Sequence, residues 1–403
     1  MSIATRIYSE LRGDRSIWAI MVMLAVFSIL VVYSSTGSLA YQQYGGDTER
    51  ALFKHGLILV GGLVLAYVCH LMNYMMFARS APFLLLITIP LLVYTIAFGT
   101  EINDANRWIM IPFVGLTFQT SDLAELALIL HVAREISSKQ DYIKDFNGAF
   151  LPIIVPILII CGLIAPSDLS SAMVLFVVCL LMMFIGRVAL QYVFLLLLLG
   201  FVLFSFLLLL HQMFPEMDFI RVPTWSARIR EFVTNPDGGY QVEQAKIAIA
   251  NGNWLGLGPG NSMQRNYLPN SYSDFIYAII VEEYGLIGGF TVIGLYVLLF
   301  FRITRLITKS SKAFGAMVVL GLGVSMVIQA FANIAVSVHL VPVTGLTLPM
   351  ISMGGTSILF TCISFGIILS VSRFVEGINP IGGLVPADDD DDFDLSAFDD
   401  DDE

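Results

Sequence analysis

Apolar stretches long enough to cross a lipid bilayer recur along most of the chain. A bilayer core of about 30 Å needs roughly 20 apolar residues in a helix. Such stretches occupy residues 17–34, 52–71, 80–98, 118–136, 149–165, 170–186, 188–211, 274–301, 314–336 and 352–373. Three arginines precede the first stretch, as in a signal peptide, but no small-residue cleavage site follows it. The pattern predicts an all-α polytopic membrane protein with about ten transmembrane helices in one domain over residues 16–375.

Composition and charge agree with a membrane protein. Of the 403 residues, 57% are hydrophobic and 13% are charged, against about 25% charged residues in soluble domains. The net charge is −11, but residues 388–403 hold 11 of the 32 acids, which leaves 21 acids against 21 basic residues elsewhere. No nucleic-acid partner is expected, because the basic excess of such proteins is missing. The four cysteines lack the spacing of a disulfide framework or metal site.

The distribution of basic residues predicts the orientation. With the N-terminus in the cytoplasm, thirteen basic residues fall in cytoplasmic segments, and only Arg50 and Arg107 fall in short outside loops. This bias places both termini, residues 1–15 and 376–403, in the cytoplasm. The tail is dominated by Asp and has few apolar residues, so it is predicted to be disordered.

One extracytoplasmic connection, residues 212–273, is unusually long. Such connections are usually functional or disordered, and the aromatic residues in this one argue against disorder. Within it, Val242, Ala245 and Ile249 recur at helical spacing, which predicts an amphipathic helix on the membrane surface. The Gly-rich segment 256–261 resembles a phosphate-binding loop, but no P-loop Lys-Ser/Thr pair follows it.

Asp274 is the most informative ionisable residue, because it stands where the long loop meets a predicted span. If Ser271 or Ser273 caps this helix, Asp274 lies in its first turn. One interpretation is a carboxylate that stabilises the helix dipole. The other is a general base at the outer membrane boundary, kept ionised by a pKa that the helix terminus lowers.

Other acids lie in or beside predicted spans, where each costs free energy. Asp122 and Glu125 share one helix face and need a partner from another helix. Asp168 lies in a short outside loop and is typical of a helix N-cap. Glu282 and Glu283 lie two turns beyond Asp274 on other faces, which favours structural pairing with other helices.

Two further features lie near the predicted outer face. Arg107, beside Trp108, is either an interface anchor or a ligand for an anionic headgroup. Residues 333–357 contain two prolines and three glycines. Broken backbone at membrane depth is tolerated only where protein or a cavity surrounds it, so this segment is predicted to be re-entrant and to line a site.

Three sequence blocks together resemble the SEDS family of bacterial cell-wall polymerases, most closely its division branch. The first block is Asn106-Arg-Trp-Ile with Gly115-Leu-Thr-Phe-Gln-Thr-Ser-Asp122. The second runs from Gly239-Tyr-Gln through 256–261 to Asp274-Phe-Ile-Tyr-Ala and Glu282-Glu-Tyr-Gly285, and the third is 333–357. The resemblance covers about residues 15–375.

The resemblance implies an enzyme of the inner membrane that polymerises lipid II into glycan strands during septal wall synthesis. It implies that Asp274 is the catalytic base, and that substrate is bound by residues of the matching regions: Arg107, Asp168, Gln241, Lys246, Asn261 and Asn333. Arg107, Arg228 and Lys246 suit a diphosphate leaving group. No cofactor is certain, and a divalent cation, Mg²⁺ or Mn²⁺, is the candidate. The implied partners are a class B penicillin-binding protein, which is a transpeptidase, and other membrane proteins of the division machinery.

The chain also departs from the family pattern. Glu125 stands where Lys is frequent and Thr120 where Pro is frequent, which leaves the role of Asp122 open. Met353 and His339 also differ from the usual residues. Three alternatives stay open: a flippase or transporter for lipid-linked precursors, an elongation-type polymerase, and a non-catalytic scaffold. A transporter would carry its ionisable site near the membrane midplane, whereas Asp274, Asp168 and Arg107 map to the outer face.

Overall fold

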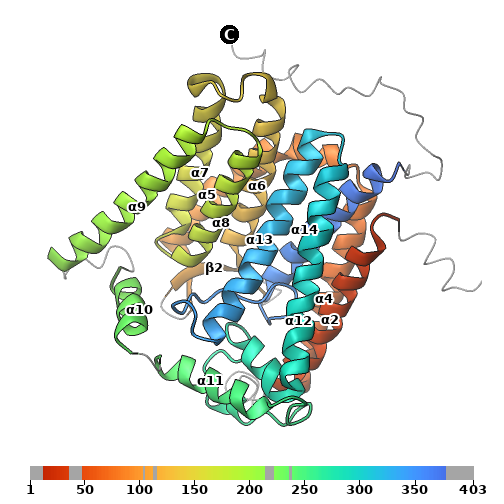
Figure 1. Ribbon diagram of the computed structural model, residues 1–403, viewed down its shortest axis with the longest axis vertical. Helices are drawn as coiled ribbons and strands as arrows, with labels where there is room; N and C mark the ends of the chain where they lie inside the picture. Colours follow the sequence, from red (N-terminus) through yellow and green to blue (C-terminus); the bar gives the residue numbers. More distant parts are fainter. Residues whose placement is uncertain are drawn as a thin grey trace, which may run out of the picture.

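The computed structural model describes residues 12–35, 48–102, 105–111, 116–213, 222–235 and 238–377. Most of these residues form a helical bundle (Figure 1). Its long helices are α2 (Arg15–Ser35), α4 (Thr48–Leu71), α5 (Tyr74–Phe98), α6 (Thr120–Ser138), α7 (Leu151–Ile164), α8 (Leu169–Ile185), α9 (Leu190–Met213), α12 (Ile276–Lys309), α13 (Ala313–Ser337) and α14 (Thr356–Val375). The predicted disorder of the acidic tail lies outside the described residues.

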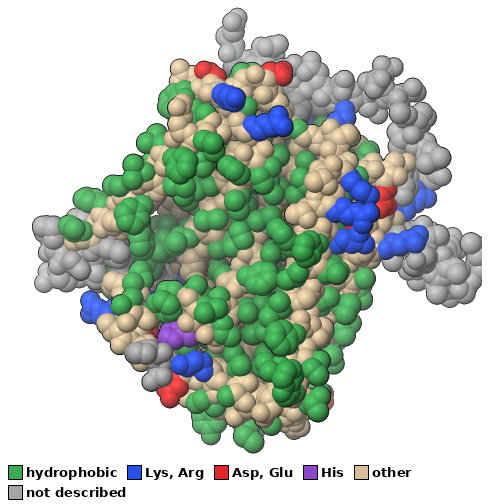
Figure 2. All heavy atoms as spheres, viewed as in Figure 1, with side chains coloured by type: hydrophobic (Ala, Val, Ile, Leu, Met, Phe, Trp, Pro, Cys, Tyr) green, Lys and Arg blue, Asp and Glu red, His purple; other side chains and the backbone are tan. Residues whose placement is uncertain are grey.

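Each of the ten predicted spans coincides with one of these helices. Among the described residues, seven helices are long and apolar enough to cross a membrane by length and composition. The other three are α8 and α9, whose apolar stretches are shorter, and α6, which carries four charged residues. The fold class is therefore confirmed, while the count of ten spans stays a prediction. The exposed surface of the bundle is largely hydrophobic (Figure 2), as contact with lipid requires.

The sequence did not predict a small antiparallel sheet at one end of the bundle. Strands β1 (Thr100–Ile102), β2 (Ala105–Ile111) and β3 (Leu116–Gln119) pair in that order. Trp108 lies opposite Gln119 across β2 and β3, so the predicted span at 118 begins as strand and turns helical at Thr120. A hydropathy window misses this sheet, because its strands are only three to seven residues long and β3 runs directly into α6.

The long connection before α12 carries α10 (Val222–Thr234) and α11 (Tyr240–Gly252). Helix α11 confirms the predicted helix around Val242, Ala245 and Ile249. Its apolar face packs against α12, however, with Val242 and Ala245 buried. The apolar face of α11 is therefore covered by protein, while the location of this helix on the membrane surface stays a prediction.

The Gly-rich segment 256–261 packs against α12 and does not act as a phosphate-binding loop. The N–H groups of Leu257 and Gly258 donate to the carbonyls of Glu282 and Glu283, over 2.9 and 3.0 Å. Helix α12 is interrupted at Gly285, where φ is 69° and a Cβ atom would overlap the Trp254 backbone. The N–H groups of Leu257 and Gly258 therefore already have carbonyl acceptors on α12.

Residues 338–355, between α13 and α14, form the irregular segment that the sequence predicted as re-entrant. Leu348, Met350 and Ile351 are buried in the bundle. Backbone carbonyls of the segment accept hydrogen bonds from neighbouring helices: Ser28 Oγ donates to Ile351 over 2.9 Å, and Tyr296 donates to Pro349. Because protein groups satisfy the broken backbone, this segment can hold a fixed shape inside the bundle.

Candidate active site

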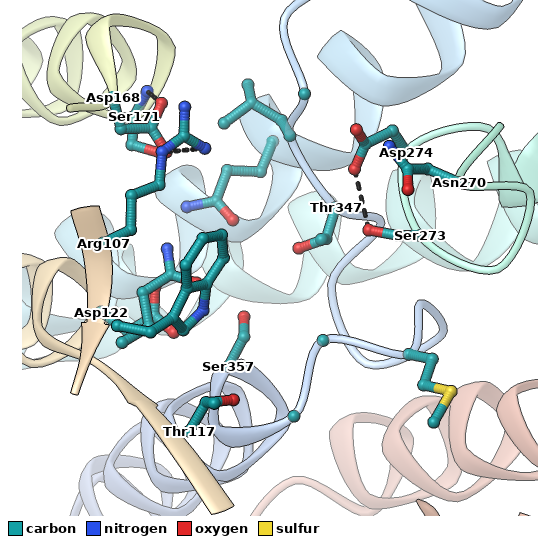
Figure 3. A pocket seen from close by; sticks show the side chains of 18 of the residues that line it. Arg107, Thr117, Asp122, Asp168, Ser171, Asn270, Ser273, Asp274, Thr347 and Ser357 are labelled. Atoms are coloured by element: carbon teal, nitrogen blue, oxygen red, sulfur yellow. Dashed lines mark hydrogen bonds and ion pairs between the residues drawn. The ribbon is translucent and has the colours of Figure 1, made fainter. Parts of the chain in front are cut away.

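A cavity of about 350 Å³ opens between the 338–355 segment, the sheet and several helices (Figure 3). Its charged lining consists of Lys54, Arg107, Asp122, Glu125, Asp168, Arg228 and Asp274. These side chains come from parts of the chain up to 220 residues apart, and they converge on one space. A concave site with convergent charges is the expected form of a binding site for a polar ligand.

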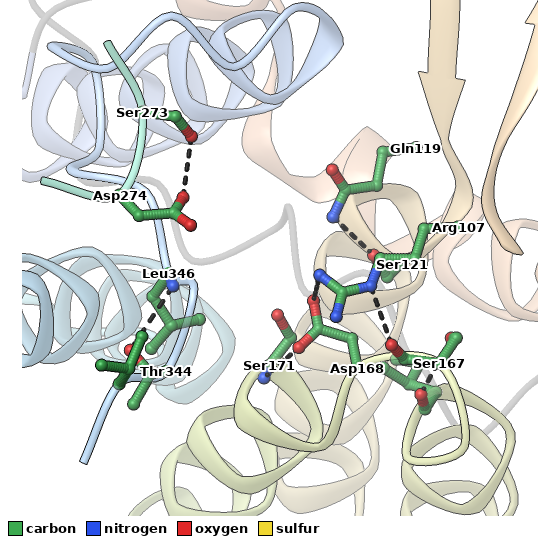
Figure 4. Close-up of polar contacts among 12 residues, drawn as sticks. Arg107, Gln119, Ser121, Ser167, Asp168, Ser171, Ser273, Asp274, Thr344 and Leu346 are labelled. Carbon is green, nitrogen blue, oxygen red and sulfur yellow. Dashed lines mark hydrogen bonds and ion pairs between the residues drawn. The ribbon is translucent and has the colours of Figure 1, made fainter. Parts of the chain in front are cut away.

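Asp274 lines one side of the cavity, just before α12. The helix begins at Ile276, and its N-cap residue Phe275 makes no side-chain cap. The prediction that Ser271 or Ser273 caps a helix whose first turn contains Asp274 is therefore wrong. Ser273 Oγ instead donates to Asp274 Oδ1 over 2.8 Å (Figure 4). This bond orients the carboxylate and leaves Oδ2 for another partner.

Burial raises the pKa of Asp274 above that of an ordinary aspartate. The hydrogen bond from Ser273 and the positive charges of Arg107 and Arg228 oppose this rise, and the negative charge of Asp168 adds to it. The predicted lowering of this pKa by a helix terminus is therefore wrong. A raised pKa suits a general base, because a base is more effective when its pKa approaches the working pH.

Arg107 and Asp168 form an ion pair on the side of the cavity opposite Asp274 (Figures 3 and 4). Arg107, on β2, approaches Asp168 within 3.1 Å and donates from Nε to the Ser167 carbonyl over 2.8 Å. Asp168 also caps α8 by accepting from the Ser171 N–H over 3.2 Å, which confirms its predicted N-cap role. The guanidinium is thus held by two partners and still faces the cavity.

Asn333 lies behind the cavity and joins Asp274 to the 338–355 segment. Its amide nitrogen donates to the backbone carbonyl of Asp274 over 2.8 Å and to that of Leu346 over 2.7 Å. Ser352 Oγ reinforces the link by donating to the Ser273 carbonyl over 2.7 Å. Asn333 is therefore placed to position the site; it is not among the cavity-lining residues.

We expect Asn333→Leu to lower both stability and activity. Leu fills a similar volume but leaves two buried carbonyls without a donor, each at a cost of about 1–3 kcal/mol. The resulting displacement of Asp274 should reduce turnover roughly 10- to 100-fold. The control is Ser337→Ala, one turn along α13, which removes only a bond to the Asn333 carbonyl. Equal melting temperatures and turnover for the two variants would contradict this role.

Asp122 and Glu125 line another part of the cavity, on α6. Glu125 accepts hydrogen bonds from Ser325 and from Gln329 Nε2, the latter over 2.9 Å, and both donors lie on α13. The predicted partner from another helix is thus confirmed for Glu125. Asp122 Oδ2 is buried without a hydrogen-bond partner among the described residues.

Glu282 and Glu283 have partners mainly in the preceding loop. Glu282 accepts from the hydroxyl of Ser262 and from the N–H of Gln264 over 3.3 Å. Glu283 accepts from the Ser262 N–H over 3.2 Å and from Ser34 on α2. Both acids tie the loop to the bundle, as a structural role requires. The predicted partners from other helices are Ser34 for Glu283 and, for Glu282, Asn251 of α11, whose amide nitrogen donates over 3.4 Å.

Three predicted substrate-binding residues lie away from the described cavity lining. Gln241 and Lys246 are on α11, and the Asn261 side chain donates to the Leu257 carbonyl over 3.1 Å. Two basic lining residues, Lys54 and Arg228, carried weaker sequence signals. Lys54 is a lone cation within the apolar stretch 52–71, while Arg228 belongs to a loop whose fold the sequence does not specify.

A Mg²⁺ or Mn²⁺ ion stays a prediction. The described residues contain no group of three His, Cys, Asp or Glu side chains arranged to hold a metal ion. Asp274 and Asp168 also stand on opposite sides of the cavity (Figure 3). A divalent cation here would need oxygen ligands from a bound substrate in addition to single protein carboxylates.

The bundle and its charged cavity define a class: a helical membrane protein with a cavity, lined by both acidic and basic side chains, that suits a polar ligand. Comparison with known proteins gives the family. Residues 14–377 match the FtsW/RodA/SpoVE family of cell cycle proteins, and the chain belongs to that family.

Curated relatives align with nearly the whole chain. A probable peptidoglycan glycosyltransferase FtsW of Nitrosococcus halophilus is 32% identical, over 85% of this chain and 87% of its own. The corresponding protein of Geobacter sulfurreducens is 30% identical, over 94% of this chain and 100% of its own.

Solved structures share the fold. A chain from a peptidoglycan synthase complex that coordinates polymerization and crosslinking superposes with a TM-score of 0.69, at 23% identity, covering 90% of this chain and 98% of that one. The rod shape determining protein RodA of Thermus thermophilus gives a TM-score of 0.62, also at 23% identity, covering 90% of this chain and 97% of that one.

Proposed function

We propose that this protein is a peptidoglycan glycosyltransferase of the inner membrane, which polymerises lipid II during septal wall synthesis. The observation that carries the proposal is the geometry of the cavity: a carboxylate with a raised pKa faces a fixed guanidinium across it. Glycosyl transfer from a diphosphate donor needs a base for the acceptor and cations for the leaving group. The relatives named as probable peptidoglycan glycosyltransferases support the same activity.

The chemical step uses residues on both sides of the cavity. Asp274 takes the proton from the 4-hydroxyl of the acceptor N-acetylglucosamine as that oxygen bonds to the anomeric carbon of the donor N-acetylmuramic acid. The bond from this carbon to the lipid diphosphate breaks, and the diphosphate leaves with the electron pair. Arg107 and Arg228 stabilise the negative charge on the departing phosphate. Attack on the face opposite the leaving group inverts the anomeric centre.

The decisive experiment is polymerisation of lipid II by the purified protein, alone and with a class B penicillin-binding protein. Synthesis of glycan strands that requires the intact cavity would support the enzyme. Movement of lipid II across a vesicle membrane without any glycan product would favour the flippase alternative. A protein without either activity that still assembles with its partner would be a scaffold. The solved complex that couples polymerization to crosslinking supports the choice of a transpeptidase partner.

As the pH is lowered, the rate of polymerisation should begin to fall at a higher pH than it would if the base had the pKa of an ordinary aspartate. The active base is the ionised carboxylate, and burial raises the pKa of Asp274, so the acid limb lies above about pH 4. The same pKa shift affects stability in the opposite direction. A carboxyl whose pKa is higher in the folded than in the unfolded protein stabilises the folded state below the unfolded-state pKa, and this stabilisation is lost as the pH rises through the folded-state pKa. A pH profile of kcat/KM with a limb at the usual Asp value would contradict the role.

Truncation after Pro386 should leave polymerisation in detergent unchanged. The removed residues contribute 11 acids but no apolar periodicity, and they are predicted to lie on the membrane side opposite the cavity. Glycan yield from truncated and intact protein is compared at equal concentration. A large loss of product would show that the tail supports catalysis.

A further inference from the structure

Basic side chains gather where α2 begins and α12 ends, far from the cavity. We name this cluster the basic patch: Arg15, Arg302, Arg305, Lys309 and Lys312. Lys and Arg side chains are seen together beside the end of α12 (Figure 2). Arg15, Arg305, Lys309 and Lys312 are exposed, while Arg302 is half-buried and lies 3.6 Å from Asp14. Among the residues that the structure describes, positive charge is therefore in excess at this end of the bundle.

The chain leaves α14 next to the basic patch. Glu376, the residue after α14, lies close enough to Asp14, Lys309, Arg15 and Arg302 for their charges to act on it. Residues 388–403, which hold 11 acids and no basic residue, begin only 12 positions later. A fully extended chain reaches at most about 43 Å to the first of these acids and about 97 Å to the last, so the whole segment stays tethered within reach of the patch. Tethering over such a distance gives an effective concentration in the millimolar range.

We propose that the acidic segment 388–403 binds the basic patch of its own chain. The segment and the patch have opposite charges, and the end of α14 holds them within reach of each other. Each exposed ion pair is weak, so the contact depends on several pairs and on the tether, and salt weakens it. The occupied patch is then screened from anionic lipid headgroups and from acidic proteins. This inference is independent of the proposed activity.

The experiment measures binding of a labelled peptide, residues 387–403, to the protein in a neutral detergent. Protein truncated after Pro386 should bind the peptide saturably, and raising the salt from about 50 to about 300 mM should weaken binding several-fold. The intact protein should bind the same peptide roughly tenfold or more weakly, because its own tail competes. A peptide with all eleven acids replaced by amides should not bind.

Matched lysine variants test the location of the site. In the truncated protein, Lys309→Glu should weaken peptide binding roughly three- to tenfold, because one attraction becomes a repulsion. Lys144→Glu, at an exposed lysine in the connection between α6 and α7, should have little effect. Equal binding by intact and truncated protein, or equal effects of the two lysine variants, would overturn the proposal. The proposal would also be overturned if the acidic segment bound only a different basic protein, or if the basic patch bound only anionic vesicles.

Discussion

Asp274→Asn is expected to abolish glycan synthesis while the protein stays folded. The amide keeps the shape of the side chain and can still bond to Ser273, but it cannot accept the proton of the acceptor hydroxyl. A general base contributes about 10²–10⁴-fold to a rate, and loss of that size is expected here. Lipid II polymerisation and the melting temperature should be measured on the same preparation.

The melting temperature separates the catalytic role from a structural one. Since the folded environment raises the pKa of Asp274, a neutral amide should stabilise the fold slightly or leave its stability unchanged. The control is Asp141→Asn, at an exposed aspartate outside the cavity, which should keep full activity. An Asp274→Asn protein that polymerises lipid II at a normal rate would sink the assignment of Asp274 as the base.

Arg107→Ala should impair both donor handling and stability. The diphosphate loses a charge-assisted contact, and Asp168, whose side chain is only 6% exposed, loses its cation. Because Arg107 itself is partly exposed, the cost in stability should be about 1–3 kcal/mol. Arg107→Lys restores a point charge without the planar fork, and should therefore recover activity only in part.

A second ion pair provides the control for this loss of stability. Lys139 lies 2.7 Å from Glu135, with both side chains similarly buried, and neither residue lines the cavity. Lys139→Ala should therefore cost some stability without lowering the rate of polymerisation. If Arg107→Ala also melts early yet polymerises at the wild-type rate, Arg107 only secures the Asp168 loop and does not act on the donor.

Local patterns in the sequence predicted much of this protein. The positions of the ten helices follow from apolar windows of about 20 residues, because the cost of exposing backbone to lipid forces each such window into a helix. Two prolines and three glycines were enough to predict the broken segment between α13 and α14. The N-cap at Asp168 was also predictable, since a cap needs only the residue and the helix that follows.

The resemblance to a known family supplied the chemistry that local patterns left open. Spacing alone left Asp274 between a helix-dipole role and a catalytic role. The matching blocks favoured the catalytic role, and the match of residues 14–377 then established the family. The individual catalytic and binding roles stay predictions until the variants are measured.

Only the tertiary structure decided which residues meet. The pairing of Arg107 with Asp168, the bond from Asn333 to the Asp274 carbonyl and the contact of Gln329 with Glu125 join residues 59 to 204 positions apart. No periodic pattern records such contacts, because they depend on how helices pack and not on which segments are helical. The raised pKa of Asp274 has the same origin: the sequence placed the carboxylate at a loop boundary, and the cavity walls assembled around it set its burial and its neighbouring charges.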